Sequence, residues 1–307
     1  MPSPALTVII VAYRSAAHLP ACFEALSAAA VGIAWEMVVV DNASGDGTPA
    51  VVERGAPGAR LIVNDANRGF AAAVNQASRT ARGRYLLFLN PDAHPLPGCV
   101  SRLVAELDAV PQAALAGPQL LDPGGTPQPS AWPAPGFLSL AYDAFLLHNL
   151  MPRSRLRLVT PAGEDPVDVE CLSGACLLVR RSAFETLGGL DERFFIYFED
   201  TDLALRARAA GHRVRLVPAA RAVHLVGGSS FQDRREFLFR FSESRRLFLA
   251  KHNRGMRGAL LRALHWSGLA LRMGVYAAAG AWSAQRRAQA RDHAAVLLSR
   301  RSSARRG

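Results

Sequence analysis

Three polar groups in this sequence follow apolar segments at widely separated points of the chain. Asp92 comes after the short apolar segment Tyr85–Leu89, which is typical of an inner strand of a parallel sheet. Asp200 comes after the aromatic segment Phe194–Phe198, and His224 lies shortly after another strand-like segment. Ligands of open α/β sheets bind beyond the carboxyl ends of the strands, so these side chains are the first candidates for a functional site.

The loop that carries Asp92 is expected to be stiff, because Pro91 fixes its own φ and restricts Asn90. A carboxylate that faces a phosphate there is best explained by a divalent cation between them. His224 would complete a mixed oxygen and nitrogen site suited to Mg²⁺ or Mn²⁺. The alternative is an ordinary turn built from Asn, Pro and Asp, with His224 in a structural role.

Acidic residues dominate the segment that starts at Glu199 and continues through Asp200 to Asp202. The aromatic residues that precede them would raise the pKa of a neighbouring carboxyl group and prepare it to accept a proton. They would also offer an apolar face on which a sugar ring can stack. The alternative is a helix start, where acidic side chains cap the backbone and favour the helix dipole; one acid suffices for that, so both interpretations can hold.

Two further segments suit a nucleotide. Asp41 directly follows the strand-like segment Glu36–Val40, and at this strand end it could accept hydrogen bonds from a nucleobase or a ribose. Asn67, Arg68 and Gly69 open a predicted helix, and such a helix start suits a phosphate, although Asn67 would also serve as a plain N-cap. The sequence contains neither a Gly-rich dinucleotide fingerprint nor a GxxxxGK[ST] motif, so neither a Rossmann NAD site nor a P-loop is supported.

The elements that must position these residues alternate between strands and helices through the first half of the chain. Such alternation predicts an α/β fold with a mainly parallel sheet and right-handed crossovers. The predicted strands are Leu6–Ala12, Glu36–Val40, Ala59–Val63 and Tyr85–Leu89. The predicted helices are Leu19–Ala30, Thr48–Arg54, Gly69–Ala81 and Cys99–Ala109.

Residues 117–167 change in character, because prolines and glycines make a stable helix or a central strand unlikely there. We expect a long lid or binding loop, whose aromatic residues near Phe137–Phe145 dock somewhere. Beyond it the predicted elements are a strand at Ala175–Val179, helices at Ser182–Leu187 and Asp200–Ala210, a strand at Val214–Val217, and then a largely helical remainder.

The charge is distributed unevenly along the 307 residues. Residues 1–233 carry 19 Arg against 22 Asp and Glu, whereas residues 234–307 carry 17 Lys and Arg against 3 Asp and Glu. The basic tail therefore points to an anionic partner surface. Within it, the apolar spacing over Gly258–Trp282 fits a helix lying in a membrane interface. A core-packing hairpin or a dimer face would give a similar pattern.

No N-terminal signal segment is recognised, and the four cysteines, Cys22, Cys99, Cys171 and Cys176, show no CxxC spacing. We therefore expect reduced thiols, and neither a zinc site nor a disulfide framework.

Six motifs occur in the order of a known family. They are Val8-Ile9-Ile10-Val11-Ala12-Tyr13, Val38-Val39-Val40-Asp41-Asn42-Ala43-Ser44, Asn67-Arg68-Gly69-Phe70, Leu89-Asn90-Pro91-Asp92, Ser173-Gly174-Ala175 and Phe198-Glu199-Asp200-Thr201-Asp202-Leu203. Together they resemble the family 2 glycosyltransferases of GT-A fold, especially the bacterial rhamnosyltransferase-like branch. The resemblance covers about residues 5–230.

The resemblance implies inverting transfer of a sugar, possibly rhamnose, from a dTDP- or UDP-sugar to a hydroxyl of a polysaccharide or lipid-linked glycan. Asp200 would be the general base, and Asp92 would be the metal carboxylate of the DxD element, whose first acid is Asn90 here. His224 would be a further ligand of Mg²⁺ or Mn²⁺. The remaining donor contacts would be Ala12, Tyr13, Asp41, Asn67, Arg68 and Asn75, and the acceptor would be bordered by Ser173, Gly174, Phe198 and Glu199.

We expect a catalytic domain over residues 1–233, followed by a basic amphipathic helical tail over 234–307. Residues 1–116 would bind the nucleotide sugar and residues 117–233 the acceptor. The tail would recruit a cytoplasmic enzyme to the anionic inner face of the plasma membrane.

Two other functions compete with this one. A metal-dependent sugar nucleotidyltransferase would use a similar α/β site but release pyrophosphate. A non-enzymatic nucleic-acid binder would use the arginine-rich tail, yet the sequence contains no recognition module, and we expect no specific nucleic-acid partner.

Overall fold

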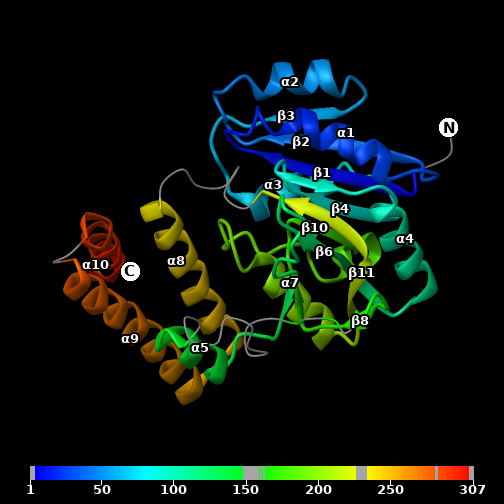
Figure 1. Cartoon of the computed structure of the whole chain (residues 1–307). Coiled ribbons are helices and arrows are strands. Elements are labelled where there is room, and N and C mark those ends of the chain that lie inside the picture. Colours follow the sequence, from blue (N-terminus) through cyan, green and yellow to red (C-terminus); the bar gives the residue numbers. More distant parts are fainter. Residues whose placement is uncertain are drawn as a thin grey trace. The chain divides into compact units, whose positions relative to one another are not determined.

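The computed structural model describes residues 4–147, 159, 161, 163–225, 234–280 and 283–303. The chain divides into two compact units. The first, here called the sheet unit, comprises residues 1–134 and 158–230, and the second, the helical unit, comprises residues 135–157 and 231–307 (Figure 1). The second unit thus includes a segment from the middle of the chain as well as the expected tail.

The sheet unit is built around a nine-stranded sheet with the path β3-β2-β1-β4-β10-β6-β11-β5, and β8 pairs with β11. Its strands are β1 Leu6–Ala12, β2 Trp35–Asp41, β3 Arg60–Val63, β4 Tyr85–Leu89, β5 Ala93–Pro95, β6 Ala113–Leu121, β8 Val167–Asp168, β10 Cys176–Arg180 and β11 Arg213–His224. The two short strands β7 Ala131–Trp132 and β9 Cys171–Leu172 form a separate antiparallel pair.

Parallel pairing holds for the first four long strands, as the alternating sequence predicts. The second half of the sheet is mixed, because β10 runs antiparallel to both β4 and β6 while β11 runs parallel to β6. Sequence alone did not reveal the reversal at β10, since a buried apolar strand looks the same in either direction.

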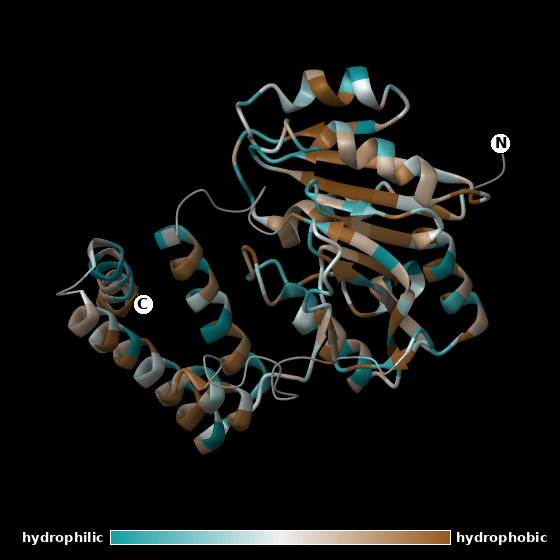
Figure 2. Cartoon of the chain, viewed as in Figure 1, coloured by the Kyte–Doolittle hydropathy of each residue, from teal (hydrophilic) through white to brown (hydrophobic). Residues whose placement is uncertain are grey.

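Helices cover both faces of the sheet (Figure 1). Helices α1 Leu19–Ala29, α2 Thr48–Gly55 and α4 Cys99–Ala109 contribute to one apolar core. Helices α3 Phe70–Ser78, α6 Arg181–Thr186 and α7 Glu199–Ala209 contribute to the other. Alternate side chains of one strand serve both, so Val8 and Ile10 enter the first core and Ile9 the second. The apolar colouring of the strands in Figure 2 follows from this two-sided burial.

The proline-rich segment contradicts our expectation of a loop. Strand β6 contains Pro118, yet it is almost wholly buried between β10 and β11. Pairing with β10 involves only Leu115 and Ala116, and the ladder to β11 is irregular just after Pro118. Proline is therefore tolerated because it sits where regular pairing ends on one side and bulges on the other. Further along, residues Phe137–Ala144 form helix α5.

The helical unit contains α5, α8 Arg234–His252, α9 Gly255–Ala279 and α10 Ala284–Ser303. Helix α5 packs against α9 so closely that a Cβ added at Gly268 would lie 2.8 Å from Ala144. Asp143 fastens the same helix, because its carboxylate accepts a 2.7 Å hydrogen bond from Arg245. Within the described residues, none of the helices combines the length and the hydropathy that crossing a bilayer requires.

Candidate active site

The carboxyl ends of β1, β2 and β4 lie at one edge of the sheet. Ala12 is paired with Asp41 where β1 and β2 end, and β4 ends beside them at Leu89. Because β10 is antiparallel, its first residue, Cys176, is paired with Leu89. The residues that precede β10 therefore reach this same edge, which is where an α/β sheet binds its ligands.

Asp92 and His224 are brought together by the pairing of two strands. His224 is the last residue of β11 and pairs with Ala93, and the N–H of Leu225 donates to the Asp92 carbonyl at 2.9 Å. The His224 Nε2 atom lies 3.7 Å from Asp92 Oδ1, and Asp92 is 1% exposed. Burial lowers the pKa of His224, against an opposing effect of Asp92, so the imidazole is neutral at pH 7.

These two side chains suit a divalent cation in part. A neutral imidazole nitrogen and a carboxylate oxygen are both metal donors, and their separation allows one ion to contact both. Within the part of the chain that the structure describes, no three His, Cys, Asp or Glu side chains form a complete metal site. Mg²⁺ commonly completes its coordination with oxygens of substrate phosphates and of water.

Asp200 lies at the start of α7 and contacts the strand edge through Gly174. The N–H of Gly174 donates to Asp200 Oδ2 at 2.9 Å, and the N–H of Thr201 donates to Oδ1 at 2.6 Å. Burial raises the pKa of Asp200, whereas these hydrogen bonds lower it; the net direction is upward. A carboxylate with a raised pKa and a fixed orientation is a competent proton acceptor.

Glu199 and Asp202 lie on either side of Asp200 in the sequence but differ in their contacts. Glu199 is 5% exposed, and its Oε2 atom finds no hydrogen-bond partner among the described residues. Burial, together with the neighbouring Asp200, holds the pKa of Glu199 well above its ordinary value, so it favours the neutral acid. Asp202 is fully buried and pairs with Arg206 Nε at 2.8 Å. Asp202 therefore has a structural role in holding Arg206.

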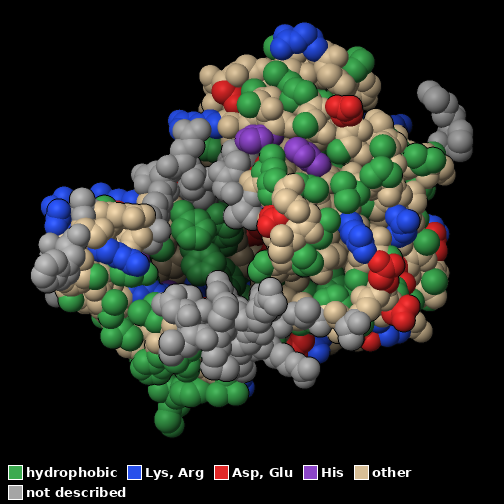
Figure 3. All heavy atoms as spheres, viewed as in Figure 1, with side chains coloured by type: hydrophobic (Ala, Val, Ile, Leu, Met, Phe, Trp, Pro, Cys, Tyr) green, Lys and Arg blue, Asp and Glu red, His purple; other side chains and the backbone are tan. Residues whose placement is uncertain are grey.

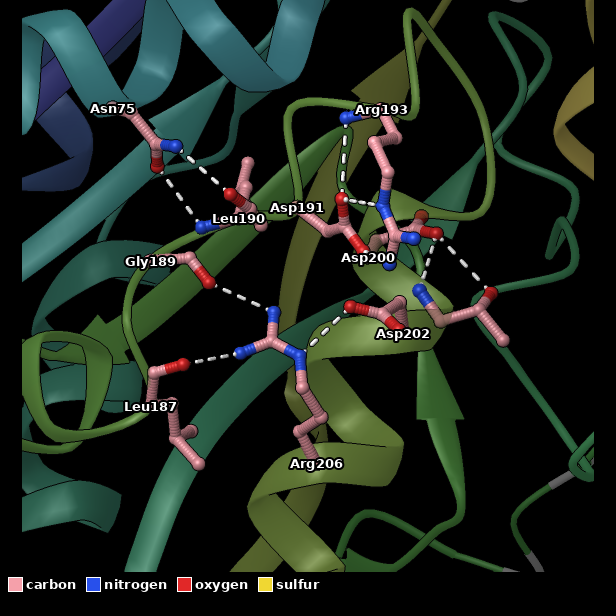
Figure 4. A network of polar contacts seen from close by, with 10 residues as sticks. Asn75, Leu187, Gly189, Leu190, Asp191, Arg193, Asp200, Asp202 and Arg206 are labelled. Carbon is pink, nitrogen blue, oxygen red and sulfur yellow. Dashed lines mark hydrogen bonds and ion pairs between the residues drawn. The ribbon is translucent and has the colours of Figure 1, made fainter. Parts of the chain in front are cut away.

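The network around Arg206 fixes the turn that leads to the acidic segment (Figure 4). Two nitrogens of the Arg206 guanidinium donate to the carbonyls of Leu187 and Gly189, at 2.7 and 2.8 Å. Asn75 of α3 binds the same turn, since its amide exchanges hydrogen bonds with the backbone of Leu190. The side chain of Asn75 also donates to Glu192, so its amide is engaged within the protein. The expected place of Asn75 along the donor stays a prediction; the structure shows its contacts with the turn.

The two acids of the expected mechanism reach the same edge through a short chain of contacts. The N–H of Asn90 donates to the Ala175 carbonyl at 2.9 Å, and the adjacent Gly174 binds Asp200. Tyr197 lies within electrostatic reach of both Asp92 and Glu199, which together with burial raise its pKa. The Asn90–Asp92 loop and the start of α7 therefore face a common region.

Gly69 joins the expected phosphate-binding segment to the aromatic segment. Gly69 has φ +82°, and a Cβ there would lie 2.5 Å from the Phe195 carbonyl oxygen. The next N–H, that of Phe70, donates to this carbonyl at 2.7 Å. The aromatic segment continues into Tyr197 and Phe198, both with φ +68°, a left-handed conformation that is costly for such side chains. Phe194 is buried, and the rest of the segment is partly exposed.

The residues expected to bind the nucleotide lie at the ends of β1 and β2 and in the loops that follow them. Asp41 is 3% exposed and accepts a hydrogen bond from the Ser44 N–H through Oδ1. Tyr13 is partly exposed beyond the end of β1, and the Arg14 guanidinium lies 5.2 Å from its ring centroid. The Ala16 N–H donates to Asp46, which ties the two loops together.

Asn42 is a positioning residue to which the sequence analysis assigned no role. It is 2% exposed, and its amide nitrogen donates to Asn67 Oδ1 at 2.9 Å while its oxygen accepts from the Arg68 N–H at 3.1 Å. The amide of Asn64 also donates to Asn42. Its partners Asn67 and Arg68 are 25 and 26 residues away in sequence, so no local pattern indicated this role. The Arg68 side chain is left exposed, 3.6 Å from Asp65.

The proline-rich segment supports the site through two hydrogen bonds. Gln128 donates to the His224 carbonyl at 3.0 Å. Ser130, which is 3% exposed, accepts the N–H of Ser173 through its carbonyl at 3.0 Å. The segment thus holds both the end of β11 and the residues that precede β10.

The arrangement defines a class of protein: a GT-A-type glycosyltransferase, with polar loops at the carboxyl edge of the sheet and an acidic helix start facing them. The model of the glycosyl transferase family 2 matches residues 7–188. The chain therefore belongs to glycosyl transferase family 2, and the resemblance drawn from the motifs is confirmed.

Individual proteins agree with this assignment. An N-acetylglucosaminyl-diphospho-decaprenol L-rhamnosyltransferase of Mycobacterium tuberculosis is 34% identical over 284 residues, covering 87% of this chain and 91% of the relative. A low-salt glycan biosynthesis hexosyltransferase of Haloferax volcanii is 26% identical over 261 residues, covering 79% of this chain and 76% of the relative. The mannosyltransferase of Pyrobaculum calidifontis, solved with GDP-Man and Mn²⁺, shares the fold with a TM-score of 0.57 at 18% identity, covering 97% of this chain and 86% of that one.

Proposed function

We propose that this enzyme transfers rhamnose, with inversion, from a nucleoside diphosphate donor to N-acetylglucosamine carried on a polyprenyl diphosphate. The observation that carries the proposal is the 34% identity to the mycobacterial rhamnosyltransferase over nearly the whole of both chains. Asp200, at the edge where the strands end, supports transfer by direct displacement.

Asp200 acts as the general base in this proposal. The acceptor hydroxyl attacks the anomeric carbon from the face opposite the diphosphate and loses its proton to the Asp200 carboxylate. The hydrogen bond from Gly174 to Oδ2 orients the carboxylate, and the N–H of Thr201 holds Oδ1. Partly exposed aromatic side chains such as Phe198 supply an apolar face for the acceptor, and Ser173 borders it.

The donor binds on the opposite side of the site. Asp41 accepts a hydrogen bond from the nucleobase or the ribose, and Tyr13 and Ala12 line the nucleoside pocket. Asn67 and Arg68 lie along the donor, held in place by Asn42. The exposed Arg68 side chain is able to move toward a phosphate, because its contact with Asp65 is long and solvent-screened.

Asp92 and His224 would hold Mg²⁺ or Mn²⁺ beside the donor diphosphate. Such an ion, when bound, neutralises the charge that develops on the leaving diphosphate. The Mn²⁺ in the Pyrobaculum structure supports this assignment. Asn90 replaces the first acid of the DxD element, so the protein supplies few anionic ligands and the diphosphate must complete the site.

The basic tail recruits the enzyme to the cytoplasmic face of an anionic membrane, where a polyprenyl-linked acceptor resides. This part rests on the excess of 17 Lys and Arg over 3 Asp and Glu in residues 234–307.

The test is an assay with purified enzyme, N-acetylglucosaminyl-diphospho-polyprenol and a panel of nucleotide sugars, with Mn²⁺ or Mg²⁺. We expect a disaccharide-lipid product and one free nucleoside diphosphate per transfer with dTDP-rhamnose, and little product with UDP-N-acetylglucosamine or GDP-mannose. Release of pyrophosphate would instead support a nucleotidyltransferase. Transfer of another sugar alone would overturn the choice of rhamnose.

A further inference from the structure

Helix α9 buries an inner face that is only partly apolar. Its buried residues are Gly258, Leu261, His265, Gly268 and Leu269, which include two glycines and a histidine. His265 Nε2 lies 2.9 Å from Ser242 Oγ, so this inner face contains a polar contact.

The outer face of α9 is apolar by comparison. Met256 is 87% exposed and Leu260 is 54% exposed, and Leu271 and Val275 are each exposed by about two fifths. Their spacing places them along one side of the helix. A surface helix normally turns such residues toward the core, so this face is suited to an apolar partner.

Helix α5 adds apolar side chains from the middle of the chain. Phe137, Leu138, Phe145 and Leu147 are all exposed. The helix is fixed to α9 at Gly268, and the Arg272 guanidinium donates to the Asp143 carbonyl. Phe137 and Leu138 therefore stand on a helix that is anchored to the rest of the unit, and Phe145 and Leu147 lie just beyond its end.

The helical unit holds most of the exposed large apolar side chains that the described residues contain. Only Val31 and Val63 of that set belong to the sheet unit. Figure 3 shows hydrophobic side chains gathered on the visible face of the helical unit. Such clustering marks an interaction surface, whereas single exposed residues like the two valines need no explanation.

Charge identifies the partner. Arg254 and Arg257 are exposed on either side of Met256, at the beginning of α9. A strongly basic unit would repel a second copy of itself, whereas anionic lipid would attract it. Aliphatic and aromatic side chains interspersed with arginine are the composition of an interfacial helix.

We infer that α5 and α9 together form a lipid-binding surface, here called the α5–α9 surface, that inserts its apolar side chains into the interface of an anionic bilayer. This inference rests on the proposed function, because a lipid-linked acceptor is the reason for the enzyme to bind a bilayer. It assigns membrane binding partly to residues 137–147, outside the basic tail, and it assigns the outward side chains of α9, not Leu261 or Leu269, to lipid contact.

The experiment is co-sedimentation of the full chain with phosphatidylcholine vesicles, with and without phosphatidylglycerol. We compare Leu138→Ser/Phe145→Ser and Met256→Ser/Leu260→Ser with the matched control Val31→Ser/Val63→Ser, which also removes exposed apolar side chains. Binding of the unaltered protein should require phosphatidylglycerol. The affinity for vesicles should fall about tenfold or more in each helical-unit variant and stay within about twofold of the original in the control.

Arg254→Gln/Arg257→Gln tests the electrostatic part and should weaken binding by severalfold, with a loss of salt dependence. Circular dichroism confirms that each variant is folded, as exposed positions permit. Unchanged vesicle binding in both apolar variants would overturn the inference. So would concentration-dependent dimers in sedimentation without any vesicle binding, because they would make the surface a contact between copies.

Failure of the proposed function would look different. A protein that binds anionic vesicles through these residues but transfers no sugar would retain the lipid-binding surface and lose the proposed reaction. An apolar variant that transfers sugar normally to a short-chain, water-soluble acceptor but poorly to acceptor in vesicles would support both.

Discussion

His224 Nε2 lies 3.7 Å from Asp92 Oδ1, although the two residues belong to different halves of the sheet unit. Pairing of β5 with β11 creates this relationship, because it aligns Ala93 with His224. This distance is longer than that of a hydrogen bond, so the contact itself does not prevent the imidazole nitrogen or the carboxylate oxygen from coordinating a metal ion. The pair is thereby left able to share a cation.

We predict that His224→Ala raises the concentration of Mn²⁺ needed for half-maximal transfer by about 10- to 100-fold, because one ligand is lost. Asp92→Asn should reduce turnover further, since it removes the anionic ligand. The measurement is a titration of the initial rate with Mn²⁺ at saturating donor. An unchanged metal dependence in both variants would contradict the assignment.

We predict that the close contact between Gly69 and Phe195 is needed to hold the expected donor-binding loop against the segment that precedes Glu199. Gly69→Ala would place a Cβ 2.5 Å from the Phe195 carbonyl oxygen, in addition to straining a φ of +82°. We expect a loss of about 2–4 kcal/mol in the free energy of unfolding and a marked fall in turnover.

Gly188→Ala is the matched control, because Gly188 has φ +78° but a Cβ added there would meet nothing within 4 Å. It should cost only about 1 kcal/mol, from backbone strain alone. Denaturant melts of both variants give the comparison. Equal losses would show that the contact with Phe195 is unimportant.

The strands of the parallel half of the sheet could be predicted from the sequence almost completely. Leu6–Ala12 and Tyr85–Leu89 have the bounds that their apolar patterns predict, because buried strands flanked by turns are locally encoded. Strand β6 was missed because Pro118 signals a break, and only the tertiary pairing shows that the position tolerates proline.

The sequence singles out the acids of the candidate site but not the residues that position the loops around them. Asp92, Asp200 and His224 stand out because strand ends and apolar neighbours are visible in sequence. The binding of the Asn75 amide to the turn at Leu190 was not predicted, because it joins distant segments and no local pattern reports it. Asn42 was overlooked for the same reason.

Arg206 is expected to be a stability residue. Arg206→Met would remove the ion pair between Arg206 and the fully buried Asp202 and would free two backbone carbonyls. We predict a loss of about 3–5 kcal/mol in the free energy of unfolding. Arg206→Lys should lose most of this as well, since one ammonium cannot reach all three acceptors. A loss below about 1 kcal/mol in a denaturant melt would contradict the importance of the network.

Glu199 should make stability depend on pH in a specific direction. Its pKa is raised in the folded protein, so between its ordinary value and the raised one the folded state binds more protons than the unfolded state. Stability from this group is therefore present at low pH and is lost as the pH rises through that window.

Glu199→Gln removes this effect. We predict that the melting temperature of the variant, relative to that of the unaltered protein, increases as the pH is raised from about 4 to about 7. No trend, or the reverse trend, in thermal melts would show that folding does not raise the pKa of Glu199.

The rate of transfer should depend on the ionisation of Asp200. Its pKa is raised above the ordinary value of 3.8, and a general base acts as the carboxylate. Turnover at saturating substrates should therefore fall as the pH drops through this raised pKa, at a higher pH than an ordinary aspartate would give. A rate that stays flat down to about pH 4 would contradict a base with a raised pKa.

The most direct measurement compares Asp200→Asn with the unaltered enzyme in two assays, turnover and donor binding by calorimetry. The substitution keeps the shape of the side chain and an oxygen able to accept the Gly174 N–H, but removes the proton acceptor. We predict a fall in turnover of about 10²–10⁴-fold, with donor affinity within about twofold of the original. Near-normal turnover in this variant would contradict the assignment of Asp200 as the base.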